Sequence, residues 1–229
     1  MGEHRRRVTI LGGHGLFTEL IEQVLDRRGY RCRVVATDSS SSGSIVSAVR
    51  ASRPEMVVAG LDLHSAYADG AVVLPALARS GHRVLAVLDD GGVSRHGQAL
   101  ALGAHAVAEK SMPLNGFLSL VRKTMNGAPV IDRAERDRLI ALYREEQGRR
   151  AMAARRLERL SAHERDILMH LMAGRSVREV AALRVVSEHT VRTQVRAILS
   201  KLGAGSQVEA VALAWRTGWG TSGELQSAG

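Results

Sequence analysis

Two arginines, Arg192 and Arg196, lie four residues apart in the C-terminal part of the chain, with Thr193 beside the first. Residues four apart share one face of a helix, so both guanidinium groups would point the same way. A guanidinium can donate two hydrogen bonds to guanine O6 and N7, and a small threonine lets the helix approach the bases closely. The spacing fits a helix that enters a DNA major groove, and a solvated amphipathic helix would show the same pattern.

The other side of residues 188–202 is apolar. Its residues recur at helical intervals and are Val191, Val195, Ile198 and Leu202. Such a stripe docks a helix on its neighbours. Residues 177–183 read as a shorter helix, and 183–186 as a tight turn. A short helix, a turn and a longer helix with one polar face form the layout of a helix-turn-helix, here at about 177–196.

Three Ser-x-x-Glu sequences begin apolar-periodic runs in this region. They are Ser161 to Glu164, Ser176 to Glu179 and Ser206 to Glu209. In such a capping box the serine hydroxyl accepts from the backbone N–H three residues on, and the glutamate accepts from the serine N–H. Ser187 is a further N-cap residue, and Gly174 and Gly203 stand where helices should end. The expected helices cover residues 162–172, 177–183, 188–202 and 207–217.

Residues 8–125 alternate short apolar runs with amphipathic stretches. The short runs read as strands because they are apolar on both faces, as buried parallel strands are. The expected strands are 8–11, 32–36, 56–60, 84–88 and 106–108. The expected helices are 16–28, 44–52, 67–80, 95–102 and 114–125. Alternation of strand and helix predicts a doubly wound parallel sheet.

A charged segment connects these two regions. The run Asn126–Pro129 ends the first region, and residues 132–157 read as a charged helix with a thin apolar stripe. This helix is either a solvated linker or also packs against a partner. We therefore predict a (βα)5 α/β domain at 1–125, a helical linker at 126–156, and an all-α four-helix helix-turn-helix domain at 157–229.

Composition narrows the class of protein. The formal net charge of +9 favours a polyanionic partner, nucleic acid first. Cys32 is the only cysteine, which excludes a disulfide framework and a Cys-based metal site and agrees with a cytoplasmic location. No run approaches the ~18 apolar residues of a membrane helix. The sequence offers no nucleophile–base pair, so we expect no enzyme, no metal, no cofactor and no membrane partner.

Residues 160–214 resemble the LuxR/NarL-type DNA-binding domain nearly end to end. The matching residues are Leu160-Ser161, Glu164-Arg165, Ala173-Gly174, Glu179-Val180-Ala181, Ser187, Thr190-Val191-Arg192, Val195, Ile198, Lys201-Leu202-Gly203 and Ala210-Val211. The resemblance implies that Arg192, Thr193 and Arg196 read bases, with His189 on the same polar face. It implies that phosphates are held by Ser187, Thr190 and Lys201. Gln194 departs from the family, where histidine is usual.

The same resemblance implies a homodimer on double-stranded DNA. The binding site would be pseudo-palindromic, with half-sites about one helical turn, ~10 bp, apart. The last helix, residues 207–217, is the usual dimer surface of the family. The function implied is that of a sequence-specific transcriptional regulator.

Residues 8–125 resemble, more loosely, the receiver domain of a response regulator. The clearest matches are residues 54–60, 101–104 and 108–110. A working receiver has an acidic pair that holds Mg²⁺, an aspartate that accepts phosphoryl, a hydroxyl residue, an aromatic residue and a lysine. These positions hold, in the same order, Gly12 and Gly13, Gly60, Leu88, Val107 and Lys110. Glycine supplies no carboxylate to Mg²⁺, so the resemblance implies an orphan regulator that acts without aspartyl phosphorylation.

The first loop allows other interpretations. Its residues Gly12, Gly13, His14 and Gly15 follow a strand and open a helix, and Asp38 ends the second strand. This is the outline of a dinucleotide-binding fingerprint, which would make the chain a nucleotide-binding enzyme or sensor, although Thr18 replaces the third glycine. Glycines in place of the acidic pair would widen the phosphorylation pocket. The widened pocket could instead bind a small ligand that controls the regulator, or the domain could simply serve dimerisation. Asp62, two residues past Gly60, is the one nearby candidate for a relocated phosphoacceptor.

Overall fold

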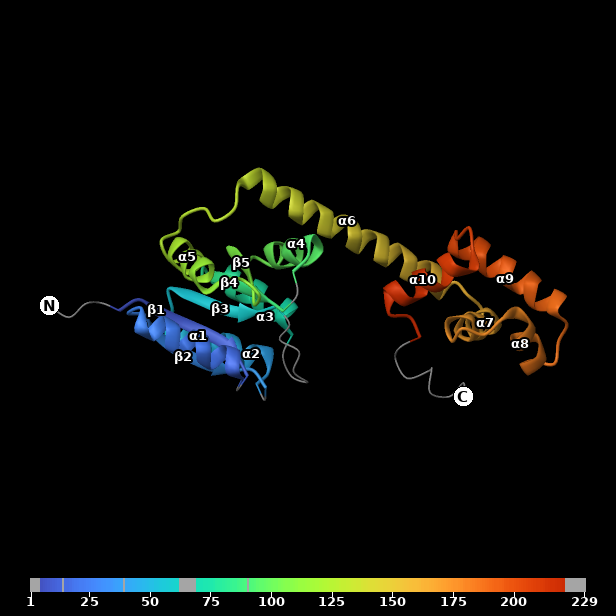
Figure 1. The fold of residues 1–229 in the computed structure, drawn as a ribbon, viewed down its shortest axis with the longest axis horizontal. Helices are drawn as coiled ribbons and strands as arrows, with labels where there is room; N and C mark the ends of the chain where they lie inside the picture. The colour runs from blue at the N-terminus through green and yellow to red at the C-terminus, as the bar shows by residue number, and fades with distance from the viewer. Residues whose placement is uncertain (1–4, 14, 39, 62–68, 90, 221–229) are drawn as a thin grey trace. The chain divides into compact units, whose positions relative to one another are not determined.

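The computed structural model describes residues 5–13, 15–38, 40–61, 69–89 and 91–220 (Figure 1). The chain divides into two compact units, Met1–Arg144 and Glu145–Gly229, which are described separately. His14 and Asp62, two of the positions singled out above, lie outside the described residues. Within the described ranges no helix combines the length and apolar character needed to span a membrane.

The first unit is built, in its described residues, on a parallel sheet of five strands in the order β2-β1-β3-β4-β5. The strands are β1 (Arg7–Gly12), β2 (Arg31–Ala36), β3 (Met56–Gly60), β4 (Arg83–Leu88) and β5 (Ala106–Glu109). The strand order reverses between β1 and β3, the point where ligands bind in open α/β sheets. The predicted doubly wound sheet is confirmed.

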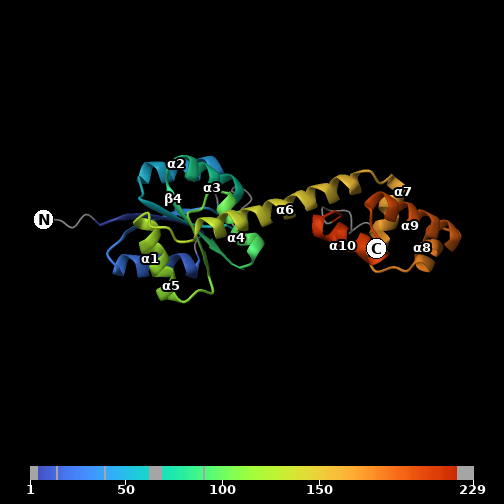
Figure 2. The ribbon, with the colours of Figure 1, turned by 90° about the horizontal axis from the view of Figure 1, so that it is seen from above.

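Helices cover both faces of this sheet (Figure 2). One face carries α1 (Leu16–Arg27) and α5 (Leu114–Met125). The other carries α2 (Ser42–Ser52), α3 (Gly70–Arg79) and α4 (Val93–Ala101). Alternate strand residues serve the two faces: in β3, Met56 packs with α1 and α5, and Val57 packs with the other three helices. Both faces of the central strands are therefore buried, which explains why β3 is apolar throughout, whereas the edge strand β2 exposes Arg31 and Arg33.

Local caps explain where α2 and α3 begin, whereas α4 begins at Val93, two residues before its predicted start, with no side-chain cap. α2 begins at Ser42, two residues early, because the Ser41 hydroxyl accepts from the Ser44 N–H at 3.2 Å. α3 begins at Gly70, where the Asp69 carboxylate accepts from the Ala71 N–H at 2.7 Å. The predicted start of that helix, at residue 67, lies outside the described residues.

The charged segment forms one helix, α6 (Arg133–Glu158). Asp132 caps it by accepting from the backbone N–H groups of Ala134 and Glu135. Its first half packs on α4: Leu139 is buried, and a Cβ built on Gly97 would lie 2.8 Å from the Cβ of Tyr143 and nearer still to the Leu139 carbonyl oxygen. Gly97 therefore permits a close approach of the two helices. Leu139 and Tyr143 thus pack against α4 within the first unit, whereas Leu142 of the same stripe is exposed.

The second unit contains α7 (Ala162–Met172), α8 (Val177–Leu183), α9 (Glu188–Leu202) and α10 (Gln207–Thr217). These bounds are the predicted ones. A core that includes Leu157, Ile167, Val180 and Ile198 joins the helices to the end of α6. Gly174 and Gly203 have φ values of +80° and +66°, the left-handed conformation expected of glycine after a helix.

Two of the three predicted capping boxes are complete and the third is not. Glu164 and Glu179 each accept from the backbone N–H of their serine at 2.7 Å, while the serine hydroxyl accepts in return. At α10 the Ser206 hydroxyl accepts from Glu209 N–H, but the Glu209 carboxylate accepts from Gly205 N–H at 2.8 Å. The glutamate reaches one residue further back, so the prediction of a full box there was wrong.

Candidate nucleic-acid interface

The two faces of α9 have opposite environments. Val191, Val195, Ile198 and Leu202 are buried, as the periodicity predicted. The other face is open to solvent, and its exposed residues are His189, Thr190, Arg192, Thr193 and Arg196. A helix held by four buried side chains presents its polar face in a fixed orientation. That geometry suits recognition of a surface as wide as a DNA groove.

The N-terminal turn of α9 is held by hydrogen bonds among residues predicted to contact DNA. The Ser187 hydroxyl accepts from the Thr190 N–H at 3.1 Å and lies 2.8 Å from the Thr190 hydroxyl. The Thr193 hydroxyl donates to the carbonyl of His189 at 3.0 Å. These bonds order the side chains along the polar face, and the Ser187 bond also satisfies one free N–H of the helix end.

The two arginines of the polar face differ in their partners. Arg192 forms an ion pair with Glu188 one turn earlier, with its Nη2 atom 2.8 Å from Glu188 Oε2. Arg196 has no ion pair or side-chain hydrogen bond in the part of the chain that the structure describes. Arg196 is therefore ready to donate, whereas Arg192 must share its guanidinium with Glu188 or leave it.

Lys201, expected to hold a phosphate, is engaged within its own unit. Its Nζ atom lies 2.6 Å from Glu164 Oε2, and the Glu164 side chain is only 11% exposed. Burial alone would raise the pKa of Glu164, but hydrogen bonds from Lys201 and Ser161 outweigh burial and hold that pKa below its usual value. Lys201 thus ties α9 to the start of α7.

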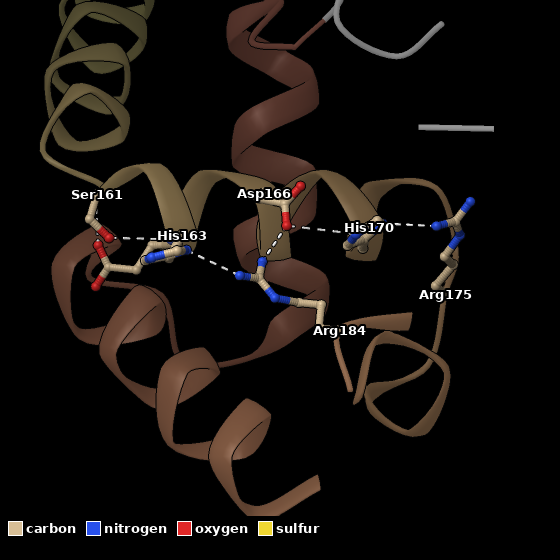
Figure 3. A network of polar contacts seen from close by, with 7 residues as sticks. Ser161, His163, Asp166, His170, Arg175 and Arg184 are labelled. Atoms are coloured by element: carbon tan, nitrogen blue, oxygen red, sulfur yellow. Dashed lines mark hydrogen bonds and ion pairs between the residues drawn. The ribbon is translucent and has the colours of Figure 1, made fainter. Parts of the chain in front are cut away.

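A polar network that was not predicted joins α7 to the turn after α8 (Figure 3). Arg184 forms an ion pair with Asp166 and donates to Nδ1 of His163 at 3.1 Å. Arg175 contacts Nδ1 of His170 at 3.0 Å, and His170 Nε2 lies 3.8 Å from Asp166. A guanidinium can only donate, so both histidines accept at Nδ1. The network fixes the turn that leads into α9.

That turn also holds an unusual residue. Val185 has φ of +54° and is 91% exposed. A β-branched residue is strained in this left-handed region. Val185 makes the tight turn between α8 and α9 at a cost in stability, and its side chain is left in solvent.

The receiver-like unit brings its degenerate positions together. Gly12 and Gly60 end neighbouring strands, since Leu11 pairs with Ala59. Leu88 ends β4, and the Lys110 N–H donates to its carbonyl at 2.9 Å. The Lys110 ammonium lies 2.5 Å from Asp89 Oδ1 and 5.1 Å from the centre of the Phe17 ring. The lysine is therefore neutralised by the side chain that follows β4.

The space where an acidic pair would lie is filled by other side chains. A Cβ on Gly12 would lie 3.3 Å from Thr18 Cγ2 and nearer its hydroxyl. A Cβ on Gly13 would lie 2.7 Å from the carboxyl carbon of Asp38. The Asp38 carboxylate thus packs against the Gly13 backbone, where a pyrophosphate would approach in a dinucleotide site. This negative charge counts against the dinucleotide interpretation.

Two further observations bear on the chemistry of the chain. Burial and nearby Asp26 raise the pKa of the Cys32 thiol to about 12, which makes it a poor nucleophile. Among the described residues there is no group of three or more His, Cys, Asp or Glu side chains that could hold a metal.

Comparisons with known proteins agree with this geometry. Residues 158–214 match the family model of bacterial regulatory proteins, luxR family. The probable transcriptional regulatory protein NarL of Mycobacterium tuberculosis is 29% identical over 213 residues, covering 92% of this chain and 94% of that protein. The transcriptional regulatory protein DegU of Brevibacillus brevis is 24% identical over 242 residues, covering 96% and 97%.

The fold of the whole chain also has a solved counterpart. The RcsB response regulator of Salmonella typhimurium, solved in a study of its DNA interaction, has a TM-score of 0.50 at 15% identity, with 93% of this chain and all of that chain covered. The chain has the architecture of a LuxR/NarL-type response regulator. Within that type it is a DNA-binding transcriptional regulator, and α8 and α9 lie within the residues that match the luxR family.

The resemblance stated from the sequence is thereby confirmed for the luxR-type domain at residues 158–214 and for the fold. The luxR match ends at residue 214, so it covers the polar face of α9 and most of α10. Both curated relatives are transcriptional regulatory proteins by name.

Proposed function

We propose that this regulator binds a pseudo-palindromic DNA operator as a homodimer and reads it without aspartyl phosphorylation. The supporting observation is the exposed face of α9, where Arg192 and Arg196 lie one turn apart on a helix whose opposite side is buried. His189 and Thr193 complete the base-facing set. Ser187 and Thr190 lie at the helix start, where backbone N–H groups favour a phosphate. We expect functional boundaries at 1–125, 126–156 and 157–229.

Arg196 is the stronger base-reading candidate of the two arginines. Its guanidinium has no competing carboxylate among the described residues, so bidentate contact with guanine costs no existing ion pair. Arg192 is oriented by Glu188 in the free protein, and DNA must compete with that exposed pair. Lys201 must leave Glu164 to reach a phosphate, so its main role is to hold α9 on α7.

Independence from phosphorylation is supported by the receiver-like unit. Gly12, Gly13 and Gly60 offer no carboxylate to Mg²⁺ or to a phosphoryl group, and Lys110 is paired with Asp89. Control then falls to dimerisation or to a small ligand. Val208 and Trp215 are exposed on α10 and supply apolar surface for a second copy of the chain.

The proposal is tested by selecting binding sites from random DNA with the full chain and footprinting the product with and without acetyl phosphate. We expect a two-fold-related footprint, unchanged by acetyl phosphate, and no gain of a phosphate in the intact mass. A one-phosphate mass gain that is lost in Asp62→Ala, together with tighter binding, would overturn phosphorylation independence. Absence of any selected site would overturn the operator.

A further inference from the structure

A cavity of about 310 Å³ lies in the first unit at the root of α6. It is lined by the loop before β5, the end of α5, the loop of residues 127–131 and the first turn of α6, all within Met1–Arg144. The cavity is separate from the degenerate receiver positions. Gly12, Gly60 and Leu88 lie at the carboxyl ends of their strands, and the cavity lies at the opposite edge of the sheet. Its size is at the lower end of the range for small-molecule sites.

The cavity wall contains an unsatisfied polar group. Thr124 is 2% exposed, and its hydroxyl has no hydrogen-bond partner in the described part of the chain. Buried hydroxyls are nearly always paired, because leaving one unpaired destabilises a protein. Among the described residues this is the one buried side-chain polar atom without a partner. The hydroxyl is also shielded from solvent, so a ligand oxygen would pair with it once the Thr124 side chain turns toward the cavity.

The other polar groups of the wall are donors. His105 accepts at Nδ1 from the Val84 N–H at 3.3 Å, so its proton lies on Nε2. Burial, together with the positive charges of Arg136 and Arg83, lowers the pKa of His105. Arg136 uses Nη2 to donate to the carbonyls of Leu100 and Ala104, and its Nε and Nη1 donors have no acceptor among the residues that the structure describes.

The cavity wall carries positive charge, and its remaining side chains are mostly apolar. Arg133 and Arg136 line it, and no lining residue is acidic. The Arg133 side chain is 94% exposed and forms an ion pair with Asp137 at 4.0 Å, so Arg136 is the more enclosed cation of the wall. Residues 128–131 are Ala, Pro, Val and Ile, so the loop gives the cavity an apolar surface. A wall that combines donors, cations and aliphatic groups matches an anion with an apolar body.

We propose that this cavity binds a small organic monocarboxylate, whose oxygens accept from Thr124, Arg136 and His105 while its apolar part packs on residues 128–131. The inference rests on the proposed phosphorylation-independent control and gives that control a site. The ligand would contact α5, the loop and α6 at once. α6 continues to Glu158, next to the luxR-type domain, so the ligand acts where the linker is anchored.

The test is a titration of the full-length protein with benzoate and with hexanoate, followed in ¹H–¹⁵N spectra. We expect saturable shifts confined to residues around 103–105 and 124–136. Thr124→Val, which keeps the shape and removes the hydroxyl, should weaken binding about threefold to tenfold. Arg133→Gln should weaken it about threefold, and Arg138→Gln, an exposed arginine of α6 paired with Glu135, should not. Neutral benzamide should bind at least about tenfold more weakly than benzoate.

Three results would overturn the proposal. The first is no saturable shift with either acid. The second is equal binding to wild type and Thr124→Val. The third is inorganic phosphate that binds as well as benzoate, which would mean a simple anion patch. Operator binding measured on the same samples separates this proposal from the proposed function. If the operator is bound without phosphorylation and neither acid binds, the cavity assignment alone fails.

Discussion

Replacing Gly97 by alanine should destabilise the first unit, although alanine is the better helix former. In an exposed helix the change gains about 1 kcal/mol. Here the new Cβ would lie 2.8 Å from Tyr143 Cβ and 3.0 Å from the Leu139 carbonyl carbon, closer than real Cβ contacts. The backbone of α6 cannot rotate away as a side chain can, and such overpacking costs about 1–3 kcal/mol. The net expectation is a loss of about 1 kcal/mol.

Gly148→Ala is the matched control, since Gly148 also lies within a helix and a Cβ there would meet no atom within 4 Å. That variant should gain about 0.5–1 kcal/mol. Urea unfolding followed by circular dichroism gives both free energies of unfolding, and hydrogen exchange of residues 133–144 gives the local effect. Exchange there should speed up in Gly97→Ala only. If Gly97→Ala stabilises as much as Gly148→Ala, α6 does not pack on α4 as described.

Three further outcomes are expected. Val185→Gly should stabilise the second unit by about 1 kcal/mol in urea unfolding, because it removes left-handed strain from an exposed side chain; a loss of stability contradicts that strain. Hydrogen bonds hold the pKa of Glu164 below its usual 4.5, so their stabilisation is complete above about pH 4.5 and is lost as pH falls through the folded value. Acid unfolding should therefore depend less steeply on pH in Glu164→Gln, and equal slopes would refute this. Introducing aspartate at Gly12, Gly13 and Gly60 together should not restore phosphorylation by acetyl phosphate, because Leu88 still stands where a receiver has a hydroxyl and the Asp38 carboxylate must first leave the space beside Gly13; a one-phosphate gain in intact mass would contradict it.

The helices of the second unit could be predicted to the residue because their signals are local. Ser161, Ser176 and Ser187 each cap through a backbone N–H three positions on, and the burial of Val191 and Ile198 follows from period alone. The third capping box failed because sequence spacing does not say whether Glu209 bonds to Gly205 or to Ser206. Both hydrogen bonds are compatible with the same Ser-x-x-Glu sequence.

The contacts between elements could not be predicted. Arg184 reaches Asp166 and His163 across 18 and 21 residues, and no spacing rule joins them. Gly97 lies inside the predicted helix at residues 95–102, and only the packing of α6 against it explains why this position has no side chain. The pairing of Lys201 with Glu164 likewise depends on how α9 crosses α7. Periodicity says which face is buried and leaves open which partner buries it.

The central claim, that α9 reads DNA through its exposed arginines, is tested by the affinity of Arg196→Ala for the selected operator and for a scrambled duplex at one salt concentration. Loss of a bidentate arginine contact should weaken operator binding about tenfold or more and leave scrambled binding nearly unchanged. Arg138→Ala, on α6, is the control and should change neither. Equal affinities of Arg196→Ala and wild type for the operator would contradict the account.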